Sequence, residues 1–465
     1  MIDFVGTPMN LRVIAVGGIV ALVVAALMVP ETTLLAMPVL VMVLMALLFF
    51  EFPWLLAALL VLVYGVALDV HVDNLTRVAG AGGVAAMGAA VVKVVPFLLT
   101  AVLLLRYGFA STINWPFLAF ACIATVSLVV LPMGRIVSNG EMIRSLVGST
   151  APFVLGFALA PKSLWTALCR GTALLPLISV FGGLLAGLVG FASPMDPFGR
   201  FQGLHSPPFL AGFCSTAIFA ATLEYLRGFK LPWLILGGIN MAILLATQAR
   251  APLGAVILFM CIVYFLSNRK AFPLKRKVDL LMGGMLPALI LLGPVLIYAM
   301  QRFFAPDYAG NSFNFSGRDI IWPFFVDAIE QRPLFGFGLG AGKLLVDPAD
   351  PGIRYLGSSA AHNEYLRLAV DGGIIGCAAV FSALVAWVVA GSRRAPPADK
   401  LVLLAAMLAV LLHSGFDNTL IASTAVIQFA WFAAAMARAR LETRASRDAS
   451  TASRAAAKRL ALASG

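Results

Sequence analysis

A short polar run at residues 361–366, with the sequence AHNEYL, closes a long hydrophilic stretch of the chain. The imidazole of His362 titrates near neutrality and can act as a general base or acid. Glu364 can orient this imidazole or help to deprotonate a hydroxyl, and Asn363 and Tyr365 can support the same site. The alternatives are a histidine that hydrogen-bonds loop backbone and a glutamate that is favoured by the dipole of a first helical turn.

Three arginines have a setting that suits phosphate binding. Arg200 lies in the glycine-containing segment 198–203, Arg250 in a tight break between two hydrophobic runs, and Arg318 after Ser316 and Gly317. Guanidinium groups bind phosphate through bidentate hydrogen bonds and stay charged when partly desolvated. An ionisable residue at membrane depth is a functional candidate by default, and Arg250 has almost no loop around it. The alternative for each is a side chain that extends to lipid headgroups.

Other polar positions leave their roles open. His413 and Asp417 lie in one polar turn that can line the same cavity, although tight turns favour Gly, Asp and Asn in any case. His205 follows Arg200 closely and can join a site or shape a loop. Glu224 lies near the end of an apolar run, where a structural ion pair would account for it.

The chain carries no recognisable cofactor motif. It has no glycine-rich nucleotide loop, no HExxH pair and no CxxC pair, so nucleotide, metal and redox cofactors have no support. The five cysteines are dispersed and odd in number, which fits neither a disulfide framework nor a zinc site. We expect a metal-independent protein without a cofactor.

The composition is that of a membrane protein. Of the 465 residues, 61% are hydrophobic and 12% are charged, and the mean hydropathy is +0.97. A soluble domain is nearer one half apolar and one quarter charged. Apolar runs of roughly 17–22 residues match the length of an α-helix that crosses a bilayer. No cleaved signal peptide is expected, because Arg12 leads directly into an apolar run.

The expected fold is therefore all-α and polytopic, with about 12–14 transmembrane helices. The apolar segments lie near 11–29, 34–50, 53–69, 84–105, 115–132, 146–161, 171–192, 208–226, 231–247, 251–267, 281–300, 368–390, 401–412 and 420–437.

The basic residues predict the orientation. They gather in the segments 269–277, 393–400 and 438–459, which an even number of spans separates from one another. Short basic loops favour the cytoplasmic side. Arg200, Arg250, Arg318 and His362 then fall on the opposite, extracytoplasmic side. The basic residues behind the net charge of +12 lie in these short loops and in the C-terminal tail. The net charge therefore does not indicate nucleic-acid binding.

Four regions follow from this pattern. A long outer segment at 301–367 predicts a small extracytoplasmic cap, with a helix near 319–330 that contains Trp322 and a glycine-spaced turn at 333–340. The remaining regions are a transmembrane region at 1–300, C-terminal transmembrane helices at 368–437 and a basic cytoplasmic tail at 438–465. We expect this tail to be disordered or a basic helix on the membrane surface.

These motifs, taken in order, carry a resemblance. They are GRFQG at 199–203, TQAR at 247–250, SGR at 316–318 with Trp322, PLFGFGLG at 333–340, and HNEYL at 362–366 followed by two glycines at 373 and 376. The chain resembles the O-antigen ligase and polymerase superfamily of bacterial membrane glycosyltransferases over residues 196–380.

The resemblance implies a glycosyltransferase in the inner membrane with its site facing the periplasm. The donor would be a glycan on undecaprenyl pyrophosphate, and the acceptor a sugar hydroxyl on lipid A–core or on another lipid-linked repeat. Arg200, Arg250 and Arg318 would bind the pyrophosphate, and His362 with Glu364 would activate the acceptor. Inversion at the anomeric carbon follows from in-line attack, and the ligase and polymerase readings both stay open, with a slight preference for polymerase.

The alternative is a transporter or flippase of lipid-linked glycans. Such proteins also have many spans and cationic cavities, but they usually contain internal repeats and broken helices at mid-membrane. No clear repeat is visible in this chain. The long outer segment that ends at His362 favours an enzyme.

Overall fold

The computed structural model describes most of the chain after residue 51. The described residues are 52, 54–67, 84–129, 136–190, 193–197, 199–267, 272–285, 293, 297, 301, 317–347, 353, 359–421 and 423–463. Within them the regular structure is helical and no strand occurs. The spans expected at 11–29 and 34–50 lie outside this part, as does most of the one expected at 281–300.

The helices have the following bounds: α3 (Trp54–Gly65), α5 (Val84–Tyr107), α6 (Trp115–Val129), α7 (Asn139–Thr150), η1 (Ala151–Phe157), α8 (Lys162–Leu188), α9 (Pro207–Gly228), α10 (Leu231–Ala246), α11 (Arg250–Leu266), α12 (Leu274–Leu280), η2 (Leu281–Met285), α14 (Arg318–Gln331), η3 (Ala341–Lys343), α16 (Glu364–Ser392), α17 (Pro397–Ser414) and α18 (Ser423–Ala463). Here η1 and η3 are 3₁₀ turns and η2 is a π turn.

Several helices have the length and composition to cross a membrane. Among the described residues, α8, α9, α16 and α17 are long and apolar enough, and five shorter apolar helices lie at Trp54–Gly65, Val94–Tyr107, Trp115–Val129, Leu231–Ala246 and Arg250–Leu266. The predicted all-α polytopic membrane fold is confirmed.

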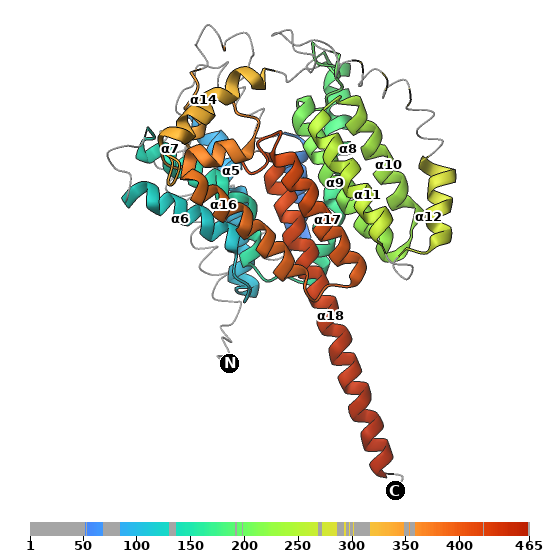
Figure 1. The fold of residues 1–465 in the computed structure, drawn as a ribbon. Coiled ribbons are helices and arrows are strands. Elements are labelled where there is room, and N and C mark those ends of the chain that lie inside the picture. The colour runs from blue at the N-terminus through green and yellow to red at the C-terminus, as the bar shows by residue number, and fades with distance from the viewer. Residues whose placement is uncertain are drawn as a thin grey trace, which may run out of the picture.

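Helix α9 forms the centre of the bundle, where it packs against α8, α10, α11, α17 and α18 (Figure 1). It is apolar all round and almost wholly buried, as expected for a helix with neighbours on every side. A second group, α5, α6, η1 and α16, packs beside it, and α14 lies on α16. The core of both groups is aliphatic and aromatic.

The segment at 146–161 differs from the single span that its sequence predicts. Residues 139–150 form α7, and the chain continues as the 3₁₀ turn η1 until Phe157. Pro152 at the start of η1 lacks an amide hydrogen, which prevents α7 from continuing as a regular α-helix. The single span that the sequence predicts is therefore an α-helix followed by a 3₁₀ turn.

Helix α16 is broken near its start, at Gly373, where φ is 68°. The glycine-spaced turn satisfies the freed backbone groups: Phe337 N donates to the carbonyl of Val370 at 2.8 Å, and Ile374 N donates to that of Pro333 at 2.7 Å. A Cβ atom on Gly373 would lie 2.1 Å from backbone atoms of Leu334, so only glycine fits there. The turn and the break together hold the first turns of α16, which carry the residues at 364–372.

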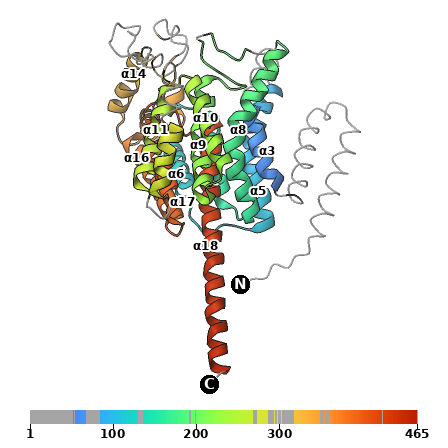
Figure 2. The ribbon, with the colours of Figure 1, turned by 90° about the vertical axis from the view of Figure 1, so that its right-hand side faces the viewer.

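The two ends of the bundle differ in character (Figure 2). We call the end at which α14 lies the cap end, and it carries Arg318 and the start of α16. We call the opposite end, from which α18 emerges, the basic end, and it carries Lys162, Arg227 and Arg438.

Helix α18 passes through the expected domain boundary at 437/438 without a break and stays helical until Ala463. Beyond the bundle it continues as a single straight helix (Figure 1). The tail is thus helical in the structure, where the sequence also allowed disorder.

Candidate functional site

His362 lies two residues before the start of α16, at the cap end. Its φ is 45°, a left-handed conformation that is uncommon for a residue other than glycine and that often marks a functional site. The Nδ1 atom lies 3.4 Å from Oδ1 of Asp417, and the side chain is 39% exposed. The imidazole is therefore oriented by a carboxylate and still open to a ligand.

Asp417 lies between two histidines. Its Oδ1 faces His362, and its Oδ2 lies 3.6 Å from Nε2 of His413, which is near the end of α17. Burial alone would raise the pKa of Asp417, but the interactions with His362 and His413 outweigh it and hold the pKa well below its ordinary value. Asp417 is consequently ionised at neutral pH.

Arg318 completes this cluster as the first residue of α14. Its Nη2 donates to the carbonyl oxygen of Phe416 at 2.9 Å, which fixes the start of α14 to the turn that carries Asp417. Burial lowers the pKa of the Arg318 guanidinium, and the Asp417 carboxylate opposes this lowering. A cation, a carboxylate and two imidazoles thus meet at one place.

Three aromatic and amide side chains hold the polar run in position. Trp322 Nε1 donates to the carbonyl of Ala361 at 2.8 Å, so α14 is also hydrogen-bonded to the residue before His362. The Asn363 side chain accepts from the amides of Tyr365 and Leu366 and caps α16. The Tyr365 hydroxyl donates to the carbonyl of Leu411 at 2.8 Å. These contacts hold the backbone on both sides of His362, and none of them involves the side chains of His362, Asp417 or Arg318.

Glu364 does not lie beside the His362 imidazole as a second reacting carboxylate. Its side chain is fully buried and forms an ion pair with Arg367, which also contacts Asp371 at 2.6 Å. Asp371 accepts in turn from the amide of Gly342 at 2.8 Å. A carboxylate without exposed surface cannot touch an acceptor in this conformation. In this conformation Glu364 holds Arg367 in place, and its expected catalytic role stays a prediction.

Arg200 is held by a carboxylate of its own loop. Its Nε donates to Oδ2 of Asp196 at 2.7 Å, and its backbone amide donates to Oδ1 at 2.8 Å. The side chain remains 30% exposed. The guanidinium is thus fixed in position and keeps an accessible face.

Arg250 begins α11, so its charge lies at the positive end of a helix dipole. The loop of Arg200 packs against the same break: Phe201 N donates to the carbonyl of Ala246 at 3.0 Å, and Gln248 Nε2 donates to that of Gly199 at 3.4 Å. Gln248 has a φ of 55°. The structure therefore brings the segments of Arg200 and Arg250 together, as a strained turn and a helix start.

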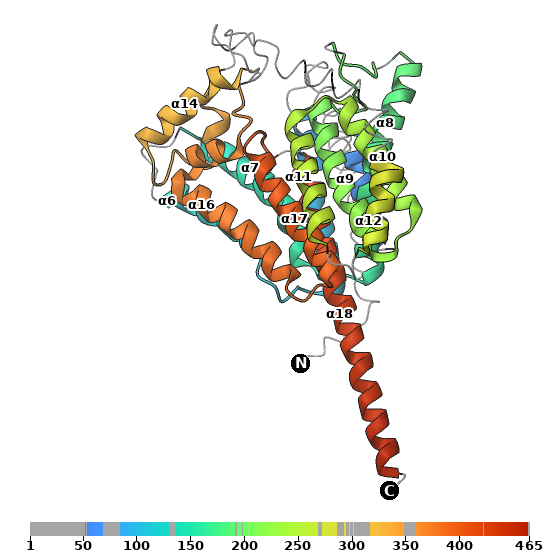
Figure 3. The same ribbon diagram turned by 45° about the vertical axis from the view of Figure 1, so that its right-hand side comes forward.

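The two groups occupy the same end of the bundle. Helix α11 packs against α17, and the two run in opposite directions, so Arg250 at the start of α11 and His413 near the end of α17 both lie at the cap end (Figure 3). Helices α9, α11 and α16 also begin there. The N-terminus of α11 adds positive potential to that of Arg250, which suits an anionic ligand.

His205 has a different role from the other histidines. It is buried, its Nδ1 lies 2.8 Å from the hydroxyl of Ser179, and its ring packs against Phe213 at 4.7 Å between centroids. These contacts join the Arg200 loop to α8 and α9, which is the loop-shaping alternative of the sequence analysis.

Some of these partners are not evident from the sequence. Asp417 and His413 follow His362 by some fifty residues and lie in a turn whose composition is ordinary. The pairing of Arg367 with Glu364 and Asp371 has a visible signal, because spacings of three and four residues place side chains on one helix face. Among the described residues, no group of three His, Cys, Asp or Glu side chains has an arrangement that could hold a metal ion.

The comparison with known families agrees with the motifs. A family model for O-Antigen ligase (Wzy_C) matches residues 234–381, which extend from α10 into α16 and contain Arg250, Arg318 and the run at 361–366. Arg200, His413 and Asp417 lie outside the matched segment. No curated protein matches the chain. The resemblance drawn from the sequence motifs is confirmed over this segment.

Proposed function

We propose that this membrane protein, whose residues 234–381 match a family model for O-antigen ligase, transfers a glycan from undecaprenyl pyrophosphate to a sugar hydroxyl at the cap end of the bundle. The proposal rests on the contacts of Asp417, which lies between His362 and His413 and beside Arg318. This gives a base, its orienting carboxylate and a cation in one place. Ligase- or polymerase-type activity in polysaccharide biosynthesis follows from the family, and the donor, acceptor and residue roles are our proposal.

His362 acts as the general base. With Nδ1–H donated to Asp417, Nε2 is the basic nitrogen of the neutral imidazole. It accepts the proton of the acceptor hydroxyl while the acceptor oxygen bonds to the anomeric carbon. The bond between that carbon and the pyrophosphate oxygen breaks on the opposite side, which inverts the configuration. Asp417 stabilises the imidazolium that forms.

Arg250 and Arg200 stabilise the leaving group. The departing pyrophosphate gains negative charge, and the partly exposed Arg200, Arg250 and the start of α11 supply fixed positive charge and donors. Arg318 holds the phosphates or the acceptor beside His362. The donor is already activated, so the transfer needs no nucleotide, and the arginines take the place of a metal at the leaving group. Glu364 acts only through Arg367, by holding the first turns of α16.

We further propose that the cap end faces the periplasm of the inner membrane. The support is the positive-inside rule, because Lys162, Arg227 and the arginines of α18 gather at the basic end. A lipid-linked donor then reaches the site from the bilayer, and the acceptor is lipid A–core for a ligase or a second lipid-linked repeat for a polymerase. We retain a slight preference for polymerase.

The test is the glycan profile of a strain that lacks this protein, complemented with wild type, His362→Ala or Arg250→Ala. Core lipid free of O-antigen, with long polymer kept on its carrier, indicates a ligase. Core with a single repeat, or loss of a secreted polysaccharide, indicates a polymerase. If both variants restore the wild-type profile at normal protein levels, the proposed site is wrong. Unchanged glycans in the deletion strain would favour the transporter alternative.

A further inference from the structure

A cavity lies at the basic end, far from the proposed transfer site. It has a volume of about 280 Å³ and is enclosed by η1, the ends of α16 and α18 within the bundle, and the loop before α6. Its walls combine apolar and polar groups: Trp115, Trp165 and Trp387 with Met436 on one hand, and Ser111, Thr112 and Arg440 on the other. This combination is typical of a site for an amphipathic molecule.

Arg440 is the distinctive member of this cavity. It is partly buried, it is the one charged group among the described residues that line the cavity, and it makes no hydrogen bond or ion pair within the described part of the chain. The preceding arginine of the same helix, Arg438, has an ion pair with Glu224. A partly buried guanidinium without a carboxylate calls for an anion from outside the chain.

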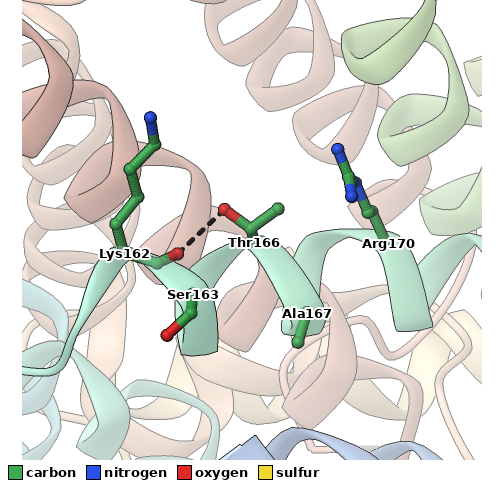
Figure 4. Close-up of a pocket in the computed structure, with 5 residues that line it drawn as sticks. All are labelled: Lys162, Ser163, Thr166, Ala167 and Arg170. Atoms are coloured by element: carbon green, nitrogen blue, oxygen red, sulfur yellow. Dashed lines mark hydrogen bonds between the residues drawn. The ribbon is translucent and has the colours of Figure 1, made fainter.

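A neighbouring pocket provides the contrast (Figure 4). It has a volume of about 450 Å³ and is lined by Lys162, Ser163, Thr166, Ala167 and Arg170, and so it also combines cations with hydroxyls. Its cations, however, are compensated, because Lys162 lies 3.0 Å from Glu442 and Arg170 lies 3.1 Å from Glu224. Positive charge alone therefore does not indicate a binding site at this end of the bundle. A partly buried cation without a carboxylate partner does.

We propose that the Arg440 cavity binds an anionic glycerophospholipid of the membrane leaflet at the basic end. The phosphate of the headgroup would accept hydrogen bonds from Arg440 and from the hydroxyls of Ser111 and Thr112. An acyl chain would lie against the tryptophans and Met436, since indole rings pack well at the boundary between headgroups and hydrocarbon. This site is independent of the proposed transfer reaction.

The test measures lipid binding to the purified full-length protein in detergent by native mass spectrometry. Phosphatidylglycerol is added to wild type, Arg440→Gln and Arg444→Gln. Arg444 is the matched control, because it lies one turn further along α18, where it is exposed. We expect the Kd for phosphatidylglycerol to rise by roughly tenfold or more in Arg440→Gln and to stay unchanged in Arg444→Gln. Phosphatidylcholine should bind more weakly to the wild type.

A second measurement examines the acyl chain. Phosphatidylglycerol with brominated chains quenches tryptophan fluorescence at short range, so it should quench the wild type through the cavity tryptophans. Ala437→Leu keeps Arg440 and places three more carbon atoms at the wall of the cavity. This variant should lose most of the quenching.

Three outcomes would overturn the proposal. Equal affinities of wild type and Arg440→Gln would exclude the guanidinium as the anchor. An equal loss in Arg444→Gln would indicate diffuse attraction by the basic helix. Displacement of the lipid by millimolar inorganic phosphate, with quenching unchanged in Ala437→Leu, would mean that the cavity binds free phosphate and no lipid chain.

Discussion

Two charged groups, one at each end of the bundle, use charge in opposite ways. At the basic end, Arg438 and Glu224 are both almost completely buried and form an ion pair, and Arg227 contacts the buried Asp399. At the cap end, His362 and Asp417 are 39% and 28% exposed, and the contact between them is 3.4 Å long. Close, buried pairs join helices, whereas long and partly open contacts leave groups available for a ligand.

The difference shows why charge or position alone does not identify a site. Glu364 lies beside His362 in the sequence but belongs to the buried, paired class. Asp417 lies in a distant turn but belongs to the open class. Backbone conformation separates the two classes as well, because His362 adopts a left-handed φ, which costs free energy unless the fold requires it.

The largest effect should come from His362. Replacement by alanine removes the general base, so transfer activity in reconstituted protein should fall by roughly 10²–10⁴-fold while the thermal midpoint of unfolding stays near that of wild type. His362→Asn is the matched variant, because asparagine also tolerates a left-handed φ. Retention of activity in His362→Asn would contradict the role of the imidazole.

Changes to the buried pair at the basic end should lower stability and not act on the transfer reaction directly. Arg438→Met leaves the Glu224 carboxylate with Arg170 as its remaining partner, which should lower the free energy of unfolding by up to about 3 kcal/mol. The double variant Glu224→Gln/Arg438→Met removes both charges and should recover much of this loss. Arg444→Ala, on the exposed part of the same helix, should change stability by less than about 0.5 kcal/mol. A similar loss in all three would show that the pair is not the cause.

Asp417 offers an intermediate test of the comparison. Asp417→Asn keeps the shape of the side chain but removes the charge that stabilises the His362 imidazolium. A hydrogen bond to a charged group contributes about 1.5–3 kcal/mol, so activity should fall by roughly 10–150-fold. The KM for the donor should stay within about threefold, because Arg200 and Arg250 remain. A change in KM alone would place Asp417 in substrate binding and not in support of the base.

Sequence reasoning predicts the class of fold correctly, and the side of the membrane that the candidate residues face stays a prediction. Hydrophobic runs predict the helices because a bilayer demands about 20 apolar residues for each crossing. The helix expected at 319–330 is α14, with bounds that differ by one residue at each end. The broken crossing at α7 and η1 is missed, since hydropathy reports composition and does not report whether a proline interrupts the hydrogen bonds.

Contacts between distant segments account for what the sequence does not predict. Glu224 and Arg438 are 214 positions apart, and no local pattern connects them. The glycines at 333–340 predict a turn. The sequence does not show why glycine is needed there, which is that Gly336 and Gly373 allow two backbone segments to come into contact. The partner of Glu364, Arg367, is three residues away, and Arg367 also contacts Asp371 four residues further on, so helical spacing alone could have predicted both contacts.

The smallest expected effect is the pH dependence of stability at the cap end. The pKa of Asp417 is lowered from its ordinary value of 3.8, so its contacts stabilise the folded state above that value. As the pH falls below about 4 and towards the lowered pKa, this contribution should disappear. Because the carboxylate is partly exposed, the loss should be a few tenths to about 1 kcal/mol.

Unfolding of wild type and Asp417→Asn between pH 3 and pH 7 measures this directly. The two curves should differ near neutrality and draw closer as the pH falls below about 4, since protonation of Asp417 in the unfolded state then removes the advantage of the charged carboxylate in the folded state. A difference that stays constant across the range would mean that Asp417 stabilises the turn through packing. In that case the open contacts of the cap end would be structural too, and the distinction between the two ends would fail.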